Sequence, residues 1–248
     1  MARFVLVHGA FGGAWSWGEF VGELERAGHT VTAIDLPGSG DDTTPVEGVT
    51  LDACADRVCQ ALAAAPEPAI LVGHSMGGVV ITQAAARCPE QISLLVFVAA
   101  FMPRDGQSLI GLTQLPEGAG DQVQANIIVE GDPPVATMTS PEARASLMAR
   151  CSPEQIARAV ERARPQPVAP FATPVSIAPG SLDHLRRVYI HTTEDVALPP
   201  PLQRRMISEN PCIEVVEIAT DHAPFLSAQQ ETLAAFERFA QLAEAPAL

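Results

Sequence analysis

Lysine is absent from this chain of 248 residues, so all 15 basic side chains are arginine. This absence excludes mechanisms that form a Schiff base on lysine, mechanisms that pair a serine with a lysine, and phosphate sites of the P-loop type. Tyrosine occurs once, as Tyr189, which leaves little room for mechanisms that use a tyrosine as acid or base. The chemistry of the chain therefore has to rest on other residue types.

Cysteines are few and form no recognisable pattern. The five are Cys54, Cys59, Cys88, Cys151 and Cys212. They contain no Cys-x-x-Cys pair and no spacing typical of metal ligands. We expect reduced, mostly buried thiols and no metal site.

Long apolar segments are also missing. The longest wholly apolar run covers nine residues, Leu94 to Met102, which is about half of what a membrane span requires. The N-terminal sequence turns polar and glycine-rich after four apolar residues, too few for a secretory signal peptide. The sequence thus predicts a cytoplasmic protein without a membrane span.

Acidic residues outnumber basic ones by 29 to 15, which gives a net charge of −14 and an isoelectric point of about 4.7. Such a chain repels the phosphate backbone of nucleic acids and the anionic headgroups of membranes. We therefore expect a small molecule as its partner, neither nucleic acid nor membrane. A homodimer with a second copy of the chain stays open.

Short β-branched or leucine-rich segments alternate with longer amphipathic ones. This alternation predicts an α/β fold, with a mostly parallel sheet of about six strands flanked by helices. The expected strands are Phe4–Val7, Thr30–Ile34, Ala69–Val72, Leu94–Ala99, Val188–His191 and Glu214–Ile218. The expected helices between them are Trp15–Arg26, Leu51–Ala65, Gly77–Arg87, Pro201–Ser208 and Ser227–Ala243.

The alternation stops between Pro103 and about Leu185. Proline and glycine are frequent there, with two candidate helices at Pro141–Arg150 and Pro153–Ala163 and one strand-like run at Ile127–Val129. A long insertion in a compact α/β domain is usually a lid or cap. We expect a core domain of residues 1–105 and 183–248, with a helical cap of residues 106–182 inserted after the fourth predicted strand.

The most specific motif is Gly73-His74-Ser75-Met76-Gly77, a G-x-S-x-G sequence between the expected strand Ala69–Val72 and a helical segment. This context is typical of a nucleophile elbow, in which a sharp strand-to-helix turn exposes a serine hydroxyl. Glycine is needed on either side because a Cβ there would collide with the adjoining strand or helix. The motif predicts Ser75 as a nucleophile.

A serine nucleophile needs hydrogen-bond donors for the oxyanion that forms on the substrate. The first expected strand ends in His8-Gly9-Ala10-Phe11-Gly12-Gly13, a loop of small residues whose backbone N–H groups can approach a substrate closely. We expect the N–H groups of Ala10 and Met76 to form the oxyanion hole. The glycine spacing in this loop does not match the G-x-G-x-x-G pattern of dinucleotide sites.

The serine also needs a base. The six candidates are His8, His29, His74, His184, His191 and His222. In proteins with a nucleophile elbow, the acid and then the histidine follow the serine along the chain. His222 comes late in the chain and lies in a loop after the last expected strand. We therefore expect His222 to be the base.

The acid that orients the base should follow the preceding strand, where Glu194 and Asp195 are neighbours. Asp195 is favoured because a short side chain can be fixed by backbone amides in the turn that follows. Glu194 and Asp105 remain alternatives. We expect Asp221, beside His222, to be a solvated or turn residue.

With these residues assembled, the chain resembles the α/β-hydrolase superfamily, and more narrowly the methylesterases, hydroxynitrile lyases and their bacterial esterase relatives. The matching segments are Phe4–Ala10, Trp15–Trp17, Ala33–Gly40, Leu71–Gly78, Ala99–Pro103, Tyr189–Ile190, Glu194–Asp195 and Asp221–His222. The resemblance implies the triad Ser75, Asp195 and His222, and it favours Asp195 over Glu194.

The chain departs from the lyase members of that family at two positions. Those members carry a threonine where Ala10 stands, and a lysine where Ala223 stands that binds departing cyanide. A chain without lysine has no such cation, so cyanohydrin cleavage is disfavoured. Relatives that open epoxides or remove halide use an aspartate nucleophile, which Ser75 excludes by analogy.

The sequence therefore predicts a serine carboxylesterase that hydrolyses small to medium apolar or aryl esters through an acyl-serine intermediate, without a cofactor. Phe11, Phe101, Met102 and Ala223 are expected to contact the substrate. Three alternatives remain: a lactone or carbon–carbon bond hydrolase with the same triad, an acyltransferase, and a non-catalytic receptor for a small ligand.

Overall fold

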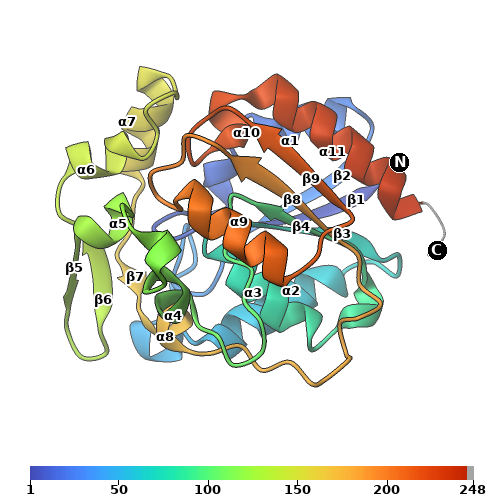
Figure 1. The fold of residues 1–248 in the computed structure, drawn as a ribbon, viewed down its shortest axis with the longest axis horizontal. Coiled ribbons are helices and arrows are strands. Elements are labelled where there is room, and N and C mark those ends of the chain that lie inside the picture. Colours follow the sequence, from blue (N-terminus) through green and yellow to red (C-terminus); the bar gives the residue numbers. More distant parts are fainter. Residues whose placement is uncertain (245–248) are drawn as a thin grey trace.

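The computed structural model describes residues 1–244. Its centre is a sheet of six parallel strands in the order β2-β1-β3-β4-β8-β9 (Figure 1). The strands are β1 (Arg3–Val7), β2 (Thr30–Ile34), β3 (Ala69–His74), β4 (Ile92–Val98), β8 (Arg187–Thr192) and β9 (Glu214–Ile218). The predicted fold class and all six predicted strands are confirmed, with shifts of one or two residues at their ends.

Helices cover both faces of this sheet (Figure 1). The core helices are α1 (Phe20–Arg26), α2 (Leu51–Leu62), α3 (Gly77–Ala85), α9 (Pro200–Glu209), α10 (Pro224–Ser227) and α11 (Gln229–Glu244). In β1, Val5 and Val7 pack into the apolar cluster shared with α2 and α3, while Phe4 and Leu6 pack into the one shared with α1 and α11. Side chains alternate between the faces of a strand, so a sheet covered on both faces needs apolar residues at successive positions.

The first predicted helix is interrupted. A short 3₁₀ helix, η1 (Ala14–Trp17), precedes α1, and Gly18 between them has a φ of 54°. A positive φ is incompatible with a continuing right-handed helix, so the chain turns at Gly18. None of the helices within residues 1–244 is long and apolar enough to cross a membrane.

The cap follows β4 and is of mixed structure. Its helices are α4 (Leu109–Thr113), α5 (Gln122–Ala125), α6 (Pro141–Ser146), α7 (Pro153–Glu161) and α8 (Ala169–Ala172). An antiparallel sheet of β5 (Ile127–Glu130), β6 (Val135–Met138) and β7 (Gln166–Pro167) lies beside them (Figure 1). The cap thus holds the predicted helices and, at β5, the predicted strand-like run Ile127–Val129. The sequence did not indicate β6 and β7, because they are too short and too close to prolines to show a strand pattern.

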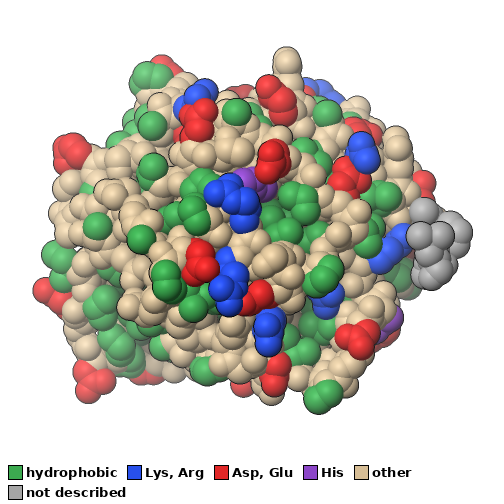
Figure 2. All heavy atoms as spheres, viewed as in Figure 1, with side chains coloured by type: hydrophobic (Ala, Val, Ile, Leu, Met, Phe, Trp, Pro, Cys, Tyr) green, Lys and Arg blue, Asp and Glu red, His purple; other side chains and the backbone are tan. Residues whose placement is uncertain are grey.

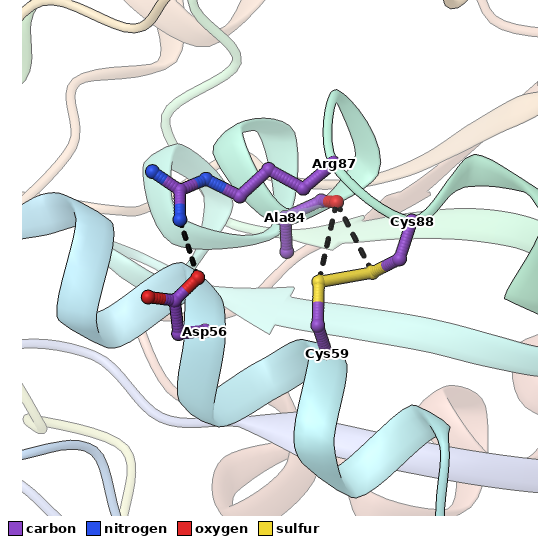
Figure 3. The surroundings of a disulfide bond; sticks show 5 residues. All are labelled: Asp56, Cys59, Ala84, Arg87 and Cys88. Atoms are coloured by element: carbon purple, nitrogen blue, oxygen red, sulfur yellow. Dashed lines mark hydrogen bonds and ion pairs between the residues drawn. A yellow bond between two sulfur atoms is a disulfide. The ribbon is translucent and has the colours of Figure 1, made fainter.

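The cysteines are not all free thiols, contrary to the sequence expectation. Cys59 on α2 and Cys88, at the start of the 3₁₀ helix η3 (Pro89–Gln91), form a disulfide with their Cα atoms 6.2 Å apart. Both sulfur atoms face the carbonyl oxygen of Ala84 (Figure 3). The spacing in the sequence could not reveal this pair because packing of α2 against α3 brings the two residues together.

Acidic and basic side chains are interspersed on the molecular face of Figure 2, with apolar side chains between them. Many of the arginines are tied to carboxylates, including Arg87 to Asp52 and Asp56, and Arg205 to Glu117 and Glu209. Seven of the 15 arginines are paired in this way within residues 1–244, and the net charge of −14 disfavours binding of a polyanion.

Candidate active site

Ser75 stands at the turn between β3 and α3, with a φ of 54°. This backbone conformation is strained for a residue with a side chain, and it is tolerated here because glycines surround it. A Cβ at Gly73 would lie 2.7 Å from the backbone of Gly77, and a Cβ at Gly77 would lie 2.7 Å from the carbonyl oxygen of Val7 on β1. The tight approach of β1, β3 and α3 holds Ser75 at the carboxyl edge of the sheet.

Asp195 and His222 come from the loops that follow β8 and β9. Nδ1 of His222 lies 2.8 Å from Oδ2 of Asp195, and both residues are buried or nearly so. Because an ionised carboxylate only accepts hydrogen bonds, Nδ1 of His222 carries the proton. Nε2 is then the unprotonated nitrogen, which is the one a base must use.

Asp195 is held by four further donors. Its Oδ1 accepts the backbone N–H groups of Ala197 and Leu198, at 2.8 and 2.9 Å. Its Oδ2 accepts from the hydroxyl of Thr192 at 2.9 Å and from the side-chain amide of Gln203 at 3.2 Å. These bonds fix the carboxylate and support its charged form in a buried place.

The other acids considered in the sequence lie elsewhere. Glu194 is exposed and forms an ion pair with Arg150. Asp105 accepts from the backbone N–H of Ile177. Asp221 is a turn residue but is not solvated, because it is 4% exposed and accepts from the backbone N–H groups of Arg150 and Ala223.

The pKa of His222 is raised above its ordinary value. Burial alone would lower it, but the charge and hydrogen bond of Asp195 outweigh burial, and the charges of Asp221 and Asp121 add to them. A raised pKa makes His222 a stronger proton acceptor, since the imidazolium that it forms is stabilised by nearby carboxylates.

Two more buried histidines hold the loops of this site. His74 donates from Nε2 to the carbonyl oxygen of His222 at 2.8 Å. His8 hydrogen-bonds the carbonyl oxygen of Gly9 through Nδ1, and its Nε2 accepts the backbone N–H of Leu36. Burial holds the pKa of His8 below its usual value and that of His74 well below it. The remaining three lie away from the site, with His29 near Glu237, His191 near Glu217 and His184 exposed.

The backbone N–H groups of Ala10 and Met76 have no hydrogen-bond acceptor within residues 1–244. Both residues line the same cavity as Ser75 and His222. The neighbouring N–H, that of Phe11, is instead bound by the side chain of Gln166 at 3.3 Å. Two unpartnered donors beside a serine are what an oxyanion hole requires.

The cavity has a volume of about 640 Å³ and lies between the core and the cap. Of the residues predicted to contact substrate, Phe11, Phe101 and Ala223 line it. Met102 does not, because the chain turns after Phe101 and the backbone N–H of Met102 faces Sδ of Met206, beside a separate hollow of about 240 Å³. Within residues 1–244, no cluster of three or more His, Cys, Asp or Glu side chains is placed to hold a metal ion.

Sequence reasoning missed the side chains that support the site. Gln203, on α9, and Gln166, in β7, are 0% and 2% exposed and bind Asp195 and Phe11, respectively. Arg144, on α6, lines the cavity from the cap. Glutamines and arginines are ordinarily surface residues, so no signal in the sequence alone marks these three.

Comparisons with known proteins identify related chains. A family model described as the alpha/beta hydrolase family matches residues 4–236. The chain is 36% identical to methylesterase 7 of Arabidopsis thaliana and to salicylic acid-binding protein 2 of Nicotiana tabacum, with 94% of each chain covered in both cases. It also resembles the crystal structure of polyneuridine aldehyde esterase, with a TM-score of 0.86, 29% identity, and coverage of 96% of this chain and 99% of that one.

Some relatives are longer than this chain. Several A. thaliana proteins named as candidate chloroplastic methylesterases, one of them 37% identical, are matched over 54% to 69% of their own length. The chain thus spans 61% of the first of these relatives.

Proposed function

Because this chain belongs to the alpha/beta hydrolase family, we propose that it is a serine carboxylesterase acting on small to medium apolar or aryl esters. The observation that carries the proposal is one cavity lined by Ser75, by His222 bound to Asp195, and by Ala10 and Met76. The backbone N–H groups of Ala10 and Met76 have no acceptor among the described residues. The relative named methylesterase 7 and the structure of polyneuridine aldehyde esterase support the same reaction class.

In the proposed mechanism, Nε2 of His222 takes the proton of the Ser75 hydroxyl as the oxygen attacks the ester carbonyl. The N–H groups of Ala10 and Met76 donate to the oxyanion of the tetrahedral intermediate. The intermediate collapses when His222 returns the proton to the leaving alcohol. Water, deprotonated by His222, then attacks the acyl-serine and releases the acid.

Asp195 acts on His222 in this mechanism. Its hydrogen bond to Nδ1 holds the imidazole in the tautomer with a free Nε2, and its charge stabilises the imidazolium in the transition state. The raised pKa of His222 supports this role.

The cavity lining supports an apolar substrate. Phe11, Phe101 and Phe171 line the cavity, with Leu109 and Leu147 from the cap. A cavity of about 640 Å³ has room for an ester that carries several further carbon atoms. The lactone hydrolase and acyltransferase alternatives would use the same groups, whereas a receptor would not turn over its ligand.

Removal of the nucleophile tests the proposal. In a panel of p-nitrophenyl and aryl-methyl esters of graded acyl length, we expect turnover by the natural chain and a loss on the order of 10⁶ in kcat for Ser75→Ala. The matched control is Ser208→Ala, which removes an exposed hydroxyl on α9. If Ser75→Ala kept more than a few per cent of the activity, the acyl-serine mechanism would be wrong.

The cytoplasmic location and the homodimer stay predictions. A fluorescent fusion and a sedimentation experiment, respectively, would test them.

A further inference from the structure

Arg144 lies on α6 and lines the same cavity as Ser75 and His222. Its Nε–H donates to the carbonyl oxygen of Ala159 on α7, at 2.8 Å. Its guanidinium carbon lies 5.7 Å from the centre of the Phe11 ring. These two contacts hold the guanidinium at the wall of the cavity that Ser75 and His222 also line.

The guanidinium of Arg144 has no counter-ion within residues 1–244. Of the fourteen other arginines, seven are paired with a carboxylate within these residues, for example Arg150 with Glu194 and Arg238 with Glu214. Three acidic residues line the same cavity, Glu19, Asp121 and Glu154, yet none has an oxygen within 4.0 Å of an Arg144 nitrogen. Only Nε has an acceptor in this part of the chain, so both terminal NH₂ groups are free.

The side chain of Arg144 is partly buried. Burial lowers the pKa of its guanidinium to about 10, so the group is still a cation at neutral pH but has lost much of its hydration. A partly desolvated cation without a partner is unfavourable by itself. The same group binds an anion more strongly than a solvated arginine does, because less water has to be displaced and the local dielectric is low.

We propose that Arg144 binds an anionic group of the substrate, so that the preferred substrate is an ester that also carries a carboxylate. This inference rests on the proposed esterase function and names its substrate class. The planar guanidinium presents its free N–H donors to both oxygens of a carboxylate. The apolar walls then contact the carbon chain between the carboxylate and the ester.

The other cations near the cavity are less suited to this role. Arg158 lines the cavity but is exposed to solvent. Arg162 lies over the Trp15 ring and pairs with Asp41. Since the whole chain carries a net charge of −14, it repels anions at long range, and selective binding of one needs a local cation such as Arg144.

Two matched pairs of esters test the inference. In the first pair the anion is on the acyl side: monomethyl adipate against the methyl ester of adipic acid monoamide. In the second it is on the alcohol side: 4-acetoxybenzoate against 4-acetoxybenzamide. Within each pair the carboxamide is neutral and nearly the same shape as the carboxylate, so the ratio of kcat/KM values isolates the charge.

We expect the natural chain to favour the carboxylate in at least one pair by about 10- to 100-fold in kcat/KM, mostly through KM. Arg144→Gln should abolish this preference, so that the kcat/KM values of the carboxylate and the carboxamide become equal within about threefold. Arg144→Lys, which keeps the charge, should retain part of the preference. Arg204→Gln removes an exposed arginine of α9 as a control for net charge and should change nothing.

A preference that survives in Arg144→Gln, or the absence of a preference in both pairs, would overturn the inference. If the proposed esterase function were wrong, the result would be distinct from these outcomes, because neither the carboxylate nor the carboxamide esters would be hydrolysed. Binding of adipate and adipamide to Ser75→Ala, measured by calorimetry, gives a readout that does not depend on turnover. Equal affinities of these two compounds at the Arg144 site would also contradict the inference.

Discussion

The residues of the site differ in how well their roles could be predicted from the sequence. Ser75 was predictable because its role depends on neighbours in the chain, the glycines of the elbow. The choice between Glu194 and Asp195 was not a local matter, since both follow the same strand. In the structure Asp195 turns inward to Thr192 and Gln203, whereas Glu194 turns outward to Arg150.

This difference gives a prediction for the two neighbouring acids. Asp195→Asn should lower kcat by roughly 10⁴, because an amide in place of the carboxylate favours the wrong tautomer of His222. Glu194→Gln should change kcat by less than about tenfold. Steady-state kinetics of both variants on one aryl ester provide the measurement, and equal losses would reverse the assignment of the acid.

At the scale of elements, apolar or β-branched runs were enough to find the six strands of the large sheet. The four inner strands β1, β3, β4 and β8 are covered on both faces and are mainly apolar, a pattern that is visible without tertiary information. The edge strands β2 and β9 are half exposed and were found from their β-branched residues. The small sheet of the cap is not covered in the way the inner strands are, because Ile128 and Val129 on β5 are 44% and 51% exposed. The paired cysteines and Met102 were mispredicted because their surroundings depend on how distant elements pack.

The loop after β1 is fixed by its approach to the elbow. A Cβ on Gly9 would lie 2.8 Å from Cβ of Ser75 and 3.0 Å from Nδ1 of His74. We therefore expect Gly9→Ala to displace the Ala10 amide and lower kcat by about 10²-fold or more, as the loss of an oxyanion donor does. Gly22→Ala, inside α1, meets only the end of the Arg26 side chain at 3.8 Å.

Gly22→Ala is the control for Gly9→Ala. Alanine is favoured over glycine within a helix by about 1 kcal/mol, so Gly22→Ala should raise the melting temperature and leave kcat unchanged. Thermal unfolding and ester turnover should be measured on both variants. Full activity in Gly9→Ala would show that the loop has room to move.

At the scale of the whole molecule, three buried histidines make stability depend on pH. His8 and His74 have lowered pKa values in the folded state, so the unfolded chain binds more protons below pH 6.5. Their contribution to the free energy of unfolding is complete above that pH and is lost as the pH falls toward the folded pKa values. His222 has a raised pKa, so its contribution is complete below pH 6.5 and is lost as the pH rises through its folded pKa.

We therefore expect the free energy of unfolding to fall as the pH decreases from 6.5, by up to about 1.4 kcal/mol per pH unit for each of the two histidines. Urea unfolding between pH 5 and 8 measures this slope. His74→Gln should reduce it, while the exposed His184→Gln should not. A slope unaffected by His74→Gln would show that His74 does not contribute to the loss of stability in acid.

The order of the elements along the chain, with the cap between β4 and β8, also sets an order in time. During synthesis at about 5 to 20 residues per second, Ser75 and the oxyanion amides leave the ribosome first, then the whole cap, and only afterwards β8 and β9 with Asp195 and His222. The interval between Ser75 and His222 is about 7 to 30 s at those rates. Under the proposed mechanism, a nascent chain that has reached the cap has its nucleophile and oxyanion donors but neither base nor acid. We therefore expect hydrolysis to begin only when the last strand joins the sheet.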